Sequence, residues 1–320
     1  MNDSRETSPI AGEAKPKVIG VRRLKEPMPT PLKTRVFTVA NQKGGVGKTT
    51  TAVNIAAALA MGGLKVLVID LDPQGNACTA LGVDRDEISG MYEVLVKDLP
   101  LSEVVTKVSG FPHLECAPAD VELAGAEINM VGFVSRESRL KLALEKFLAE
   151  REASGTRIDY VIIDCPPSLG LLTVNALTAA EEVMVPIQCE YYSLEGLTLL
   201  LKTLQQVQQM LNQRVRISTI VLTMFDSRTR LANDVANNVR QHFPNELIDV
   251  PIPRAVRVSE APSFNQTVMT YDASSPGAIA YMTVAREIAR RGSGDINNQS
   301  ANYQINNLQI NNHNNGAHTA

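Results

Sequence analysis

Several features of specialised proteins are missing from this 320-residue chain. It has no run of about 18 apolar residues, so the sequence predicts no membrane-spanning helix. The first 20 residues are polar and lack the apolar core of a signal peptide. Its four cysteines form no C-x-x-C pair and no metal-like spacing, and each lies in or beside an apolar segment. We therefore expect reduced, mostly buried thiols in a soluble, cytoplasmic protein.

The chain also lacks a strong excess of charge of either sign. Its 31 lysines and arginines stand against 34 acidic residues, which gives a net charge of −3. Composition therefore gives no indication of nucleic-acid binding, which would need a local basic patch. An apolar content of 44% and this length suffice for one large α/β domain or two smaller ones.

Composition divides the chain into three parts. Residues 1–34 hold five prolines and few large apolar side chains, so we expect a disordered arm. The arm is too short and proline-rich for a helix-turn-helix domain, which argues against sequence-specific operator binding. Residues 293–320 are dense in asparagine and are also expected to be disordered. The remaining residues, 35–292, are predicted to form the folded domain.

Within the domain, short apolar runs alternate with helical stretches. Near-continuous runs rich in β-branched residues are typical of strands buried on both faces of a parallel sheet. They occupy residues 66–69, 161–163, 183–185 and 217–224. Amphipathic helices are predicted over 135–150 and 193–211, and residues 52–61 are apolar nearly all round, as in a central helix. The pattern predicts a single doubly wound α/β domain, with a mostly parallel sheet and helices on both faces.

One stretch combines glycines and lysines between a predicted strand and a predicted helix. Residues 41–51 read N-Q-K-G-G-V-G-K-T-T-T, after the apolar run 36–40 and before the apolar run 52–61. Glycines let backbone N–H groups approach an anion, and the following helix adds its positive dipole end. A plain glycine-rich turn is the alternative. Two lysines and the adjoining threonines favour a phosphate-binding loop.

The loop assigns specific roles to its residues. The predicted ATP cradle consists of Gly44, Gly45, Val46, Gly47, Lys48, Thr49 and Thr50. Lys48 is expected to neutralise the β- and γ-phosphates, and the Thr49 hydroxyl to ligate Mg²⁺. The standard pattern G-x-x-x-x-G-K-[ST] fails, because Gln42 stands where its first glycine belongs. A second lysine, Lys43, stands at the front of the loop instead.

Two aspartates follow predicted strands directly. Asp72 belongs to D-L-D-P-Q-G-N at residues 70–76, and Asp164 follows the run 161–163. The carboxyl ends of parallel strands are where ligands bind in such sheets. Asp164 is expected to hold Mg²⁺, through a water molecule. For residues 70–76, a capping aspartate before a Pro-Gly turn is the alternative.

With its front lysine, K-G-G-V-G-K-T is a deviant Walker A motif, and the chain resembles the ParA/MinD family of dimeric P-loop ATPases. D-L-D-P-Q-G-N and D-C-P-P-S-L-G also match this family. The resemblance implies that Asp72 orients or activates the attacking water. It also implies that Lys43 reaches across a dimer interface to the other subunit's nucleotide, so the homodimer forms only with ATP. The nitrogenase iron protein shares the loop, but Cys165 lies in a proline turn, so a buried thiol is expected there.

Further segments make the resemblance specific to ParA/Soj-type chromosome partitioning ATPases. They are residues 121–127, 186–196, 222–229 and 252–263. The resemblance implies that Pro253 and Ala255 lie beside the adenine, although the family usually has asparagine where this chain has Ala255. Contact at that position would then come from the backbone. Arg228 and Arg257 match positions that the family uses for non-specific DNA binding.

A local basic patch accompanies these positions. Residues 214–257 hold seven arginines and four acids, a balance of 7 − 4 = +3. Doubled in a symmetric dimer, this patch would bind phosphates without reading bases. Surface arginines paired with nearby acids are the alternative.

The resemblance finally implies cofactors and partners. These are ATP and Mg²⁺, double-stranded DNA bound without sequence preference, a ParB-like activator, and a nucleoid-associated location. A MinD-like regulator of the division site would need a basic amphipathic C-terminal helix, which the asparagine-rich tail lacks, so no membrane contact is expected. A ParA-like ATPase that positions a protein cargo is a further alternative.

Overall fold

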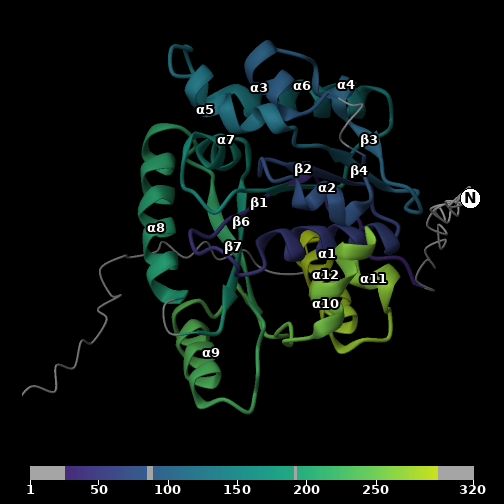
Figure 1. Ribbon diagram of the computed structural model, residues 1–320, viewed down its shortest axis with the longest axis vertical. Coiled ribbons are helices and arrows are strands. Elements are labelled where there is room, and N and C mark those ends of the chain that lie inside the picture. The colour runs from purple at the N-terminus through teal and green to yellow at the C-terminus, as the bar shows by residue number, and fades with distance from the viewer. Residues whose placement is uncertain (1–25, 85–88, 191–192, 295–320) are drawn as a thin grey trace, which may run out of the picture.

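A computed structural model describes residues 26–84, 89–190 and 193–294. At its centre is an eight-stranded sheet with the order β3-β4-β2-β5-β1-β6-β7-β8 (Figure 1). The strands are β1 Arg35–Val39, β2 Val66–Asp70, β3 Thr106–Lys107, β4 Leu114–Ala117, β5 Tyr160–Asp164, β6 Glu182–Gln188, β7 Arg216–Thr223 and β8 Leu247–Ile248. The strand pairs in this sheet are parallel except β3 with β4. The prediction of a mostly parallel sheet is confirmed.

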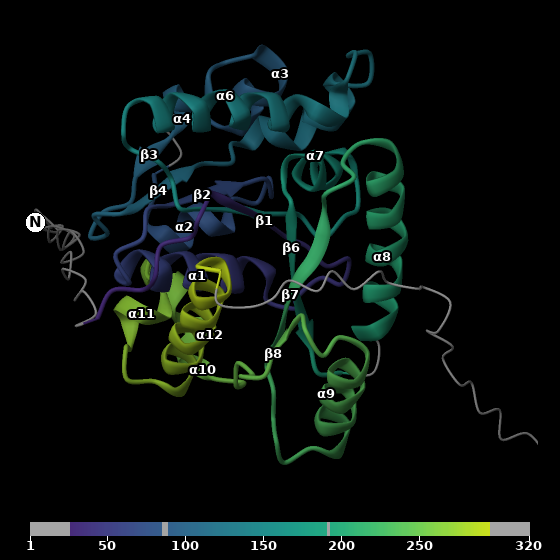
Figure 2. The same cartoon turned by 180° about the vertical axis from the view of Figure 1, so that it is seen from behind.

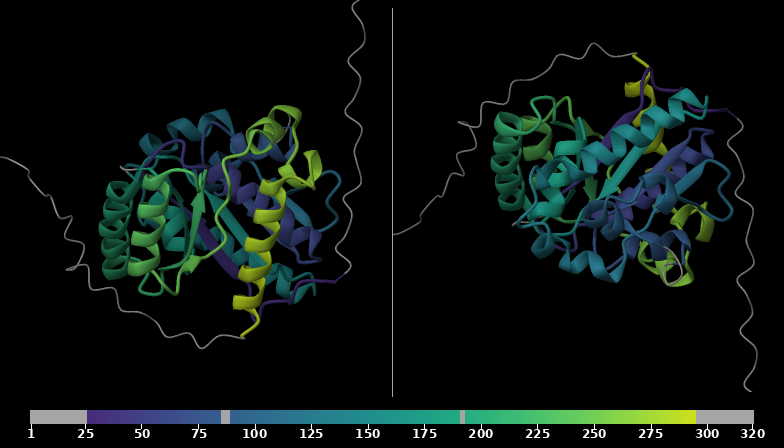
Figure 3. Two further views of the ribbon diagram at one scale, coloured as in Figure 1. Left: turned by 90° about the horizontal axis from the view of Figure 1, so that it is seen from below. Right: turned by 90° about the horizontal axis from the view of Figure 1, so that it is seen from above.

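Helices cover both faces of the sheet (Figures 1 and 2). They are α1 Lys48–Met61, α2 Asn76–Leu81, α3 Met91–Lys97, α4 Leu101–Val104, α5 Ala126–Asn129, α6 Arg139–Ala153, α7 Leu171–Ala179, α8 Ser193–Met210, α9 Arg230–His242, α10 Val256–Glu260, α11 Val268–Tyr271 and α12 Pro276–Gly292. Three 3-10 turns, η1 Val121–Gly125, η2 Arg136–Ser138 and η3 Ala261–Phe264, join them. The end-on views in Figure 3 show the sheet between the two helical layers.

Alternation along the strands builds a core on each face. In β2, Val66 and Val68 pack with α1, α2 and α12, whereas Leu67 and Ile69 pack with α3, α4, α6 and α7. Successive side chains of a strand point to opposite faces, so a strand covered on both sides reads as an unbroken apolar run. A third cluster packs α8 and α9 against β6 and β7. The helix α1 is buried almost all round between the sheet and α12, as its sequence predicts.

Residues 26–34 lie against the domain, so its folded part begins earlier than the predicted boundary at Arg35. Met28 is buried, and its N–H donates a 2.9 Å hydrogen bond to the Gly62 carbonyl just beyond α1. The Thr34 hydroxyl donates to the Ile158 carbonyl at 2.6 Å. No sequence signal indicated this packing, because Met28 and Pro31 are buried in a proline-rich segment and the Arg157 guanidinium holds its backbone by donating to the Pro31 and Leu32 carbonyls. Predicted disorder in residues 1–25 and 295–320 concerns segments outside the described residues.

The four cysteines are buried and none forms a disulfide, which confirms the expected buried thiols. Among the described helices, none combines the length and the apolar character that crossing a bilayer requires.

Candidate nucleotide-binding site

The predicted phosphate loop lies at the carboxyl end of β1, between β5 and β6 at the centre of the sheet. Gly45 and Gly47 have φ of +74° and +85°, a left-handed conformation that favours glycine. Gly47 is the N-cap of α1, and no side chain caps this helix. The first-turn N–H groups of α1 are therefore available to an anion, together with the positive end of the helix dipole.

Lys48 is folded back over this loop. Its ammonium donates a 3.3 Å hydrogen bond to the Lys43 carbonyl, and the residue is only 7% exposed. Burial lowers its pKa, and the nearby Asp164 and Asp72 carboxylates oppose that shift. The structure thus places a partly desolvated cation among the glycines, where a phosphate would be bound.

Asp164 ends β5 and is fully buried. Neither of its carboxylate oxygens has a hydrogen-bond partner within the described residues. Burial raises its pKa well above the ordinary value, the charge of Asp70 adds to the shift, and the nearby Thr49 hydroxyl and Lys48 ammonium oppose it. A buried, unpartnered carboxylate is costly, so a group that neutralises it is expected here.

Mg²⁺ fits these residues. A carboxylate oxygen of Asp164 and the hydroxyl of Thr49 are the oxygen ligands that this ion prefers, and nucleotide phosphates would complete the set. The described residues contain no cluster of three or more His, Cys, Asp or Glu side chains that could hold a metal by themselves. The structure brings the predicted pair together, with the Thr49 hydroxyl close enough to act on the Asp164 carboxylate.

Asp70 and Asp72 differ in their contacts. Asp70 accepts hydrogen bonds from the Asp72 N–H at 3.1 Å and from the Cys78 N–H at 3.2 Å, and burial raises its pKa to about 6. These hydrogen bonds fix the backbone of the segment that follows β2. Asp72 accepts from the Gln74 N–H at 3.1 Å, the contact of the turn-forming aspartate considered above. Catalysis by Asp72 stays a prediction.

Lys43 lies at the front of the loop in an ion pair of its own chain. Its ammonium is 3.0 Å from the Glu190 carboxylate, which stands two residues beyond β6. The Lys43 N–H donates to the side-chain oxygen of Asn41 at 3.0 Å. Sequence reasoning missed Glu190, because it lies 147 positions further along and belongs to no phosphate-binding pattern.

The predicted base-side residues lie beside the end of β7. Phe225 forms an isolated parallel bridge with Pro253, and Ala255 is the N-cap of α10. A pocket of about 660 Å³ opens here, lined by Phe225, Pro253 and Arg254 among others. The strand is linked to the loop by Thr223, whose hydroxyl donates to the Val46 carbonyl at 2.8 Å. Sequence reasoning missed Thr223 too, and adenine contact by Pro253 or Ala255 stays a prediction.

The two predicted DNA-binding arginines are exposed but paired. Arg228 lines the same pocket, and two of its guanidinium nitrogens donate hydrogen bonds to the Asp226 carboxylate, at 2.9 and 2.7 Å. Arg257 lies on α10, 3.1 Å from Glu260 and with its guanidinium over the Tyr271 ring. Their side chains are 87% and 56% exposed. These contacts agree with the alternative of surface arginines paired with nearby acids. Exposed ion pairs are weak, so a phosphate group can displace the acid from each arginine.

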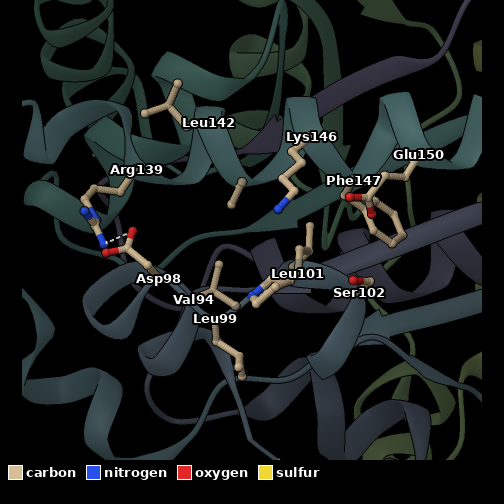
Figure 4. Close-up of a pocket in the computed structure, with 12 residues that line it drawn as sticks. Val94, Asp98, Leu99, Leu101, Ser102, Arg139, Leu142, Lys146, Phe147 and Glu150 are labelled. Carbon is tan, nitrogen blue, oxygen red and sulfur yellow. Dashed lines mark hydrogen bonds and ion pairs between the residues drawn. The ribbon is translucent and has the colours of Figure 1, made fainter.

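A second cavity of about 250 Å³ lies between α6 and the segment from α3 to α4 (Figure 4). Val94, Leu101 and Phe147 contribute apolar walls, and the Arg139–Asp98 ion pair of 2.6 Å stands at one end. No residue of the phosphate loop lines it. It is separate from the candidate site.

The fold and the site together define a class of protein. A central β1, a glycine-rich loop leading into α1, and an aspartate ending the neighbouring strand are the features of a P-loop ATPase. The AAA domain family matches residues 34–217. The sporulation initiation inhibitor protein Soj of Bacillus subtilis is 47% identical, over 81% of this chain and 99% of its own. The chromosome partitioning protein ParA of Caulobacter vibrioides is 48% identical, over 80% and 94%. This chain belongs to the ParA/Soj family of chromosome-partitioning ATPases.

A solved structure shows the same fold with nucleotide. It is that of cobyrinic acid a,c-diamide synthase from Mycobacterium smegmatis, with bound ADP and magnesium. The match has a TM-score of 0.68 and 39% identity, and covers 81% of this chain and 95% of that one.

Proposed function

We propose that this ATPase binds ATP and Mg²⁺ as a homodimer, holds double-stranded DNA without sequence preference, and lets it go when a ParB-like partner stimulates hydrolysis. One observation carries the nucleotide part: the Asp164 carboxylate is buried beside Thr49 and Lys48 and has no hydrogen-bond partner within the part of the chain that the structure describes. The names of the relatives, a chromosome partitioning protein among them, support the DNA part.

In this proposal each residue has a separate task. The backbone N–H groups of residues 44–50 bind the phosphates, and Lys48 supplies positive charge at the transferred group. Thr49 and Asp164 hold Mg²⁺, which neutralises phosphate charge when bound. Asp72 orients the attacking water from the end of β2. Lys43 reaches the other subunit's nucleotide, which couples hydrolysis to the dimer.

Arg228 and Arg257 would contact DNA phosphates. Each now faces an acid at the surface, and exposed ion pairs contribute little to stability because water and salt screen them. A DNA backbone offers many closely spaced charges and releases counterions on binding, so it competes well for such arginines. The expected location is therefore the nucleoid.

The decisive experiment measures equilibrium binding to random-sequence duplex DNA with a slowly hydrolysed ATP analogue and with ADP. We expect binding that needs the triphosphate, weakens with salt and is lost in Arg228→Glu. Arg290→Glu is the matched control, because Arg290 also forms a surface ion pair but lies at the far end of α12. Equal, negligible binding with both nucleotides would overturn the DNA proposal. It would favour an ATPase that positions a protein cargo or a MinD-like protein.

Asp72→Ala tests the assignment of the water-orienting residue. The variant is expected to hydrolyse ATP poorly and to persist as a DNA-bound dimer, because triphosphate binding is retained. Size-exclusion chromatography with ATP distinguishes the roles. A variant that stays monomeric with ATP would show that Asp72 serves only to shape the turn after β2.

A further inference from the structure

Glu190 lies where three parts of the site meet. Its carboxylate accepts hydrogen bonds from the Lys43 ammonium at 3.0 Å and from the Gln188 side-chain amide at 2.5 Å. The Arg254 guanidinium lies 3.5 Å from the same carboxylate. The contacts join the front of the phosphate loop, the end of β6 and the segment before α10.

The backbone of Lys43 is fixed, whereas its ammonium is held at the surface. Asn41, which is 1% exposed, accepts from the Lys43 N–H and donates to the Pro186 carbonyl at 2.8 Å. The start of α8 packs closely here, because a Cβ on Gly196 would lie 2.9 Å from the Asn41 oxygen. In contrast, the side chains of Lys43 and Glu190 are 26% and 45% exposed. Lys43 thus has an anchored main chain and a charged end that can move.

We propose that Glu190 is a positioning residue for Lys43. It holds the ammonium within its own subunit until the nucleotide of the partner subunit competes for it. This inference rests on the proposed ATP-dependent dimer. A triphosphate carries several negative charges against the single charge of Glu190, so the ammonium moves to the nucleotide when both are in reach.

Glu190 loses little interaction free energy when Lys43 moves to the nucleotide. An exposed ion pair is weak, so breaking it does not oppose dimerisation strongly. After Lys43 has left, Gln188 still donates to the carboxylate and the Arg254 guanidinium still offsets its charge, so Glu190 is not left without a partner. Glu190 therefore delays the engagement of Lys43 without preventing it.

A zero-length carbodiimide cross-link tests the resting contact in the full-length protein. The carbodiimide activates a carboxylate by forming an ester-like adduct with it. An adjacent amine attacks the activated carbonyl, an amide forms, and the reagent leaves as a urea. Without nucleotide we expect a cross-linked peptide that joins Lys43 to Glu190 within one chain, detected by mass spectrometry. With the ATP analogue and Mg²⁺ its yield should fall severalfold. Its absence without nucleotide, or an unchanged yield in a protein that has dimerised, would overturn the proposal.

The second test measures the dissociation constant of the ATP-bound dimer. Glu190→Gln should lower it roughly five- to twentyfold at low salt, because two ion pairs, each worth up to about fivefold, need not be broken. The difference should shrink as salt rises, since salt screens a surface pair. Glu190→Asp keeps the negative charge, so the dissociation constant of its dimer should lie close to that of wild type.

Glu181→Gln is the matched control. Glu181 also carries surface ion pairs, with Lys33 and Arg214, but it precedes β6 at the opposite end of the strand. It should leave the dimer unchanged. A Glu190→Gln dimer as weak as wild type or weaker would contradict the proposal, provided that the variant still binds ATP. If wild type itself fails to dimerise with ATP, the proposed function fails, whereas the cross-link without nucleotide still reports on the resting pair.

Discussion

The hydroxyl of Thr223 donates a 2.8 Å hydrogen bond to the carbonyl of Val46, so the last residue of β7 holds the phosphate loop from the side. The loop belongs to β1, and β6 lies between these two strands in the sheet. The contact is buried, and it makes the shape of the loop depend on a strand that is not its neighbour.

Thr223→Val should weaken ATP binding about tenfold. Valine has nearly the same shape but leaves the buried Val46 carbonyl without its donor, which costs about 1–3 kcal/mol. Titration of a fluorescent ATP analogue measures the loss. Thr219→Val is the control, because Thr219 is buried in the same strand and its hydroxyl lies 3.4 Å from that of Ser218. Equal affinities in the two variants would contradict a role of Thr223 in shaping the loop.

Gly47→Ala should destabilise the nucleotide-free protein and reduce ATP binding. The φ of +85° costs an alanine about 1–2 kcal/mol, or roughly 3–6 °C of melting temperature for a domain of this size. The cause is backbone strain, because a Cβ at Gly47 would meet its nearest atom at an ordinary 3.7 Å. Gly44→Ala has no such φ and open space for its Cβ, so its melting temperature without nucleotide should match wild type. Differential scanning calorimetry decides between them.

Asp164→Asn should stabilise the nucleotide-free protein while it abolishes Mg²⁺-dependent hydrolysis. Asparagine removes a buried carboxylate that has no hydrogen-bond partner among the described residues, and a gain of about 1–2 kcal/mol at neutral pH is expected. Asp159→Asn, just before the same strand, should lose stability instead. Asp159 accepts from the Lys65 N–H at 2.8 Å and pairs with Arg157. Urea unfolding measures the change in the free energy of unfolding of each variant. A lower free energy of unfolding in Asp164→Asn would contradict this prediction.

Arg35→Met should lower the free energy of unfolding by about 3–5 kcal/mol. Arg35 and Glu182 form an ion pair of 2.6 Å whose side chains are only 11% and 8% exposed. Removing the arginine leaves the Glu182 carboxylate buried without its cation. Glu181→Gln breaks only surface pairs and should change stability by less than about 1 kcal/mol. If urea unfolding shows equal losses, the buried pair does not hold β1 to β6.

Much of the fold was predictable because its central strands are covered on both faces. β2, β5, β6 and β7 carry long apolar runs, which are a strong local signal. The edge strands β3 and β8 have two residues each, and such short elements give no periodicity to detect. β4 was not predicted either, because Glu115 interrupts its apolar run and forms an ion pair with Arg151 of α6.

The site was predictable only where its chemistry is local in sequence. Lys48 and the glycines lie within one loop, and Asp164 follows a recognisable strand. Glu190 and Thr223 reach the same loop through the order of the strands. Both lie in segments that match the family, but no pattern around either residue shows that it contacts the loop. The acids that pair with Arg228 and Arg257 lie two and three residues away, yet only the folded geometry shows that they are in contact.

The central position of β1 has a consequence for synthesis of the chain on the ribosome. Its neighbours in the sheet, β5 and β6, are translated more than a hundred residues later, since Arg35 and Glu182 stand 147 positions apart. The helix that covers α1 is α12, the last helix of the part of the chain that the structure describes, and Arg35 also donates to the Ile288 carbonyl, 253 positions away. Contacts between such distant positions form slowly and late. We therefore expect the packing around β1 and the phosphate loop to be completed only after α12 has left the ribosome.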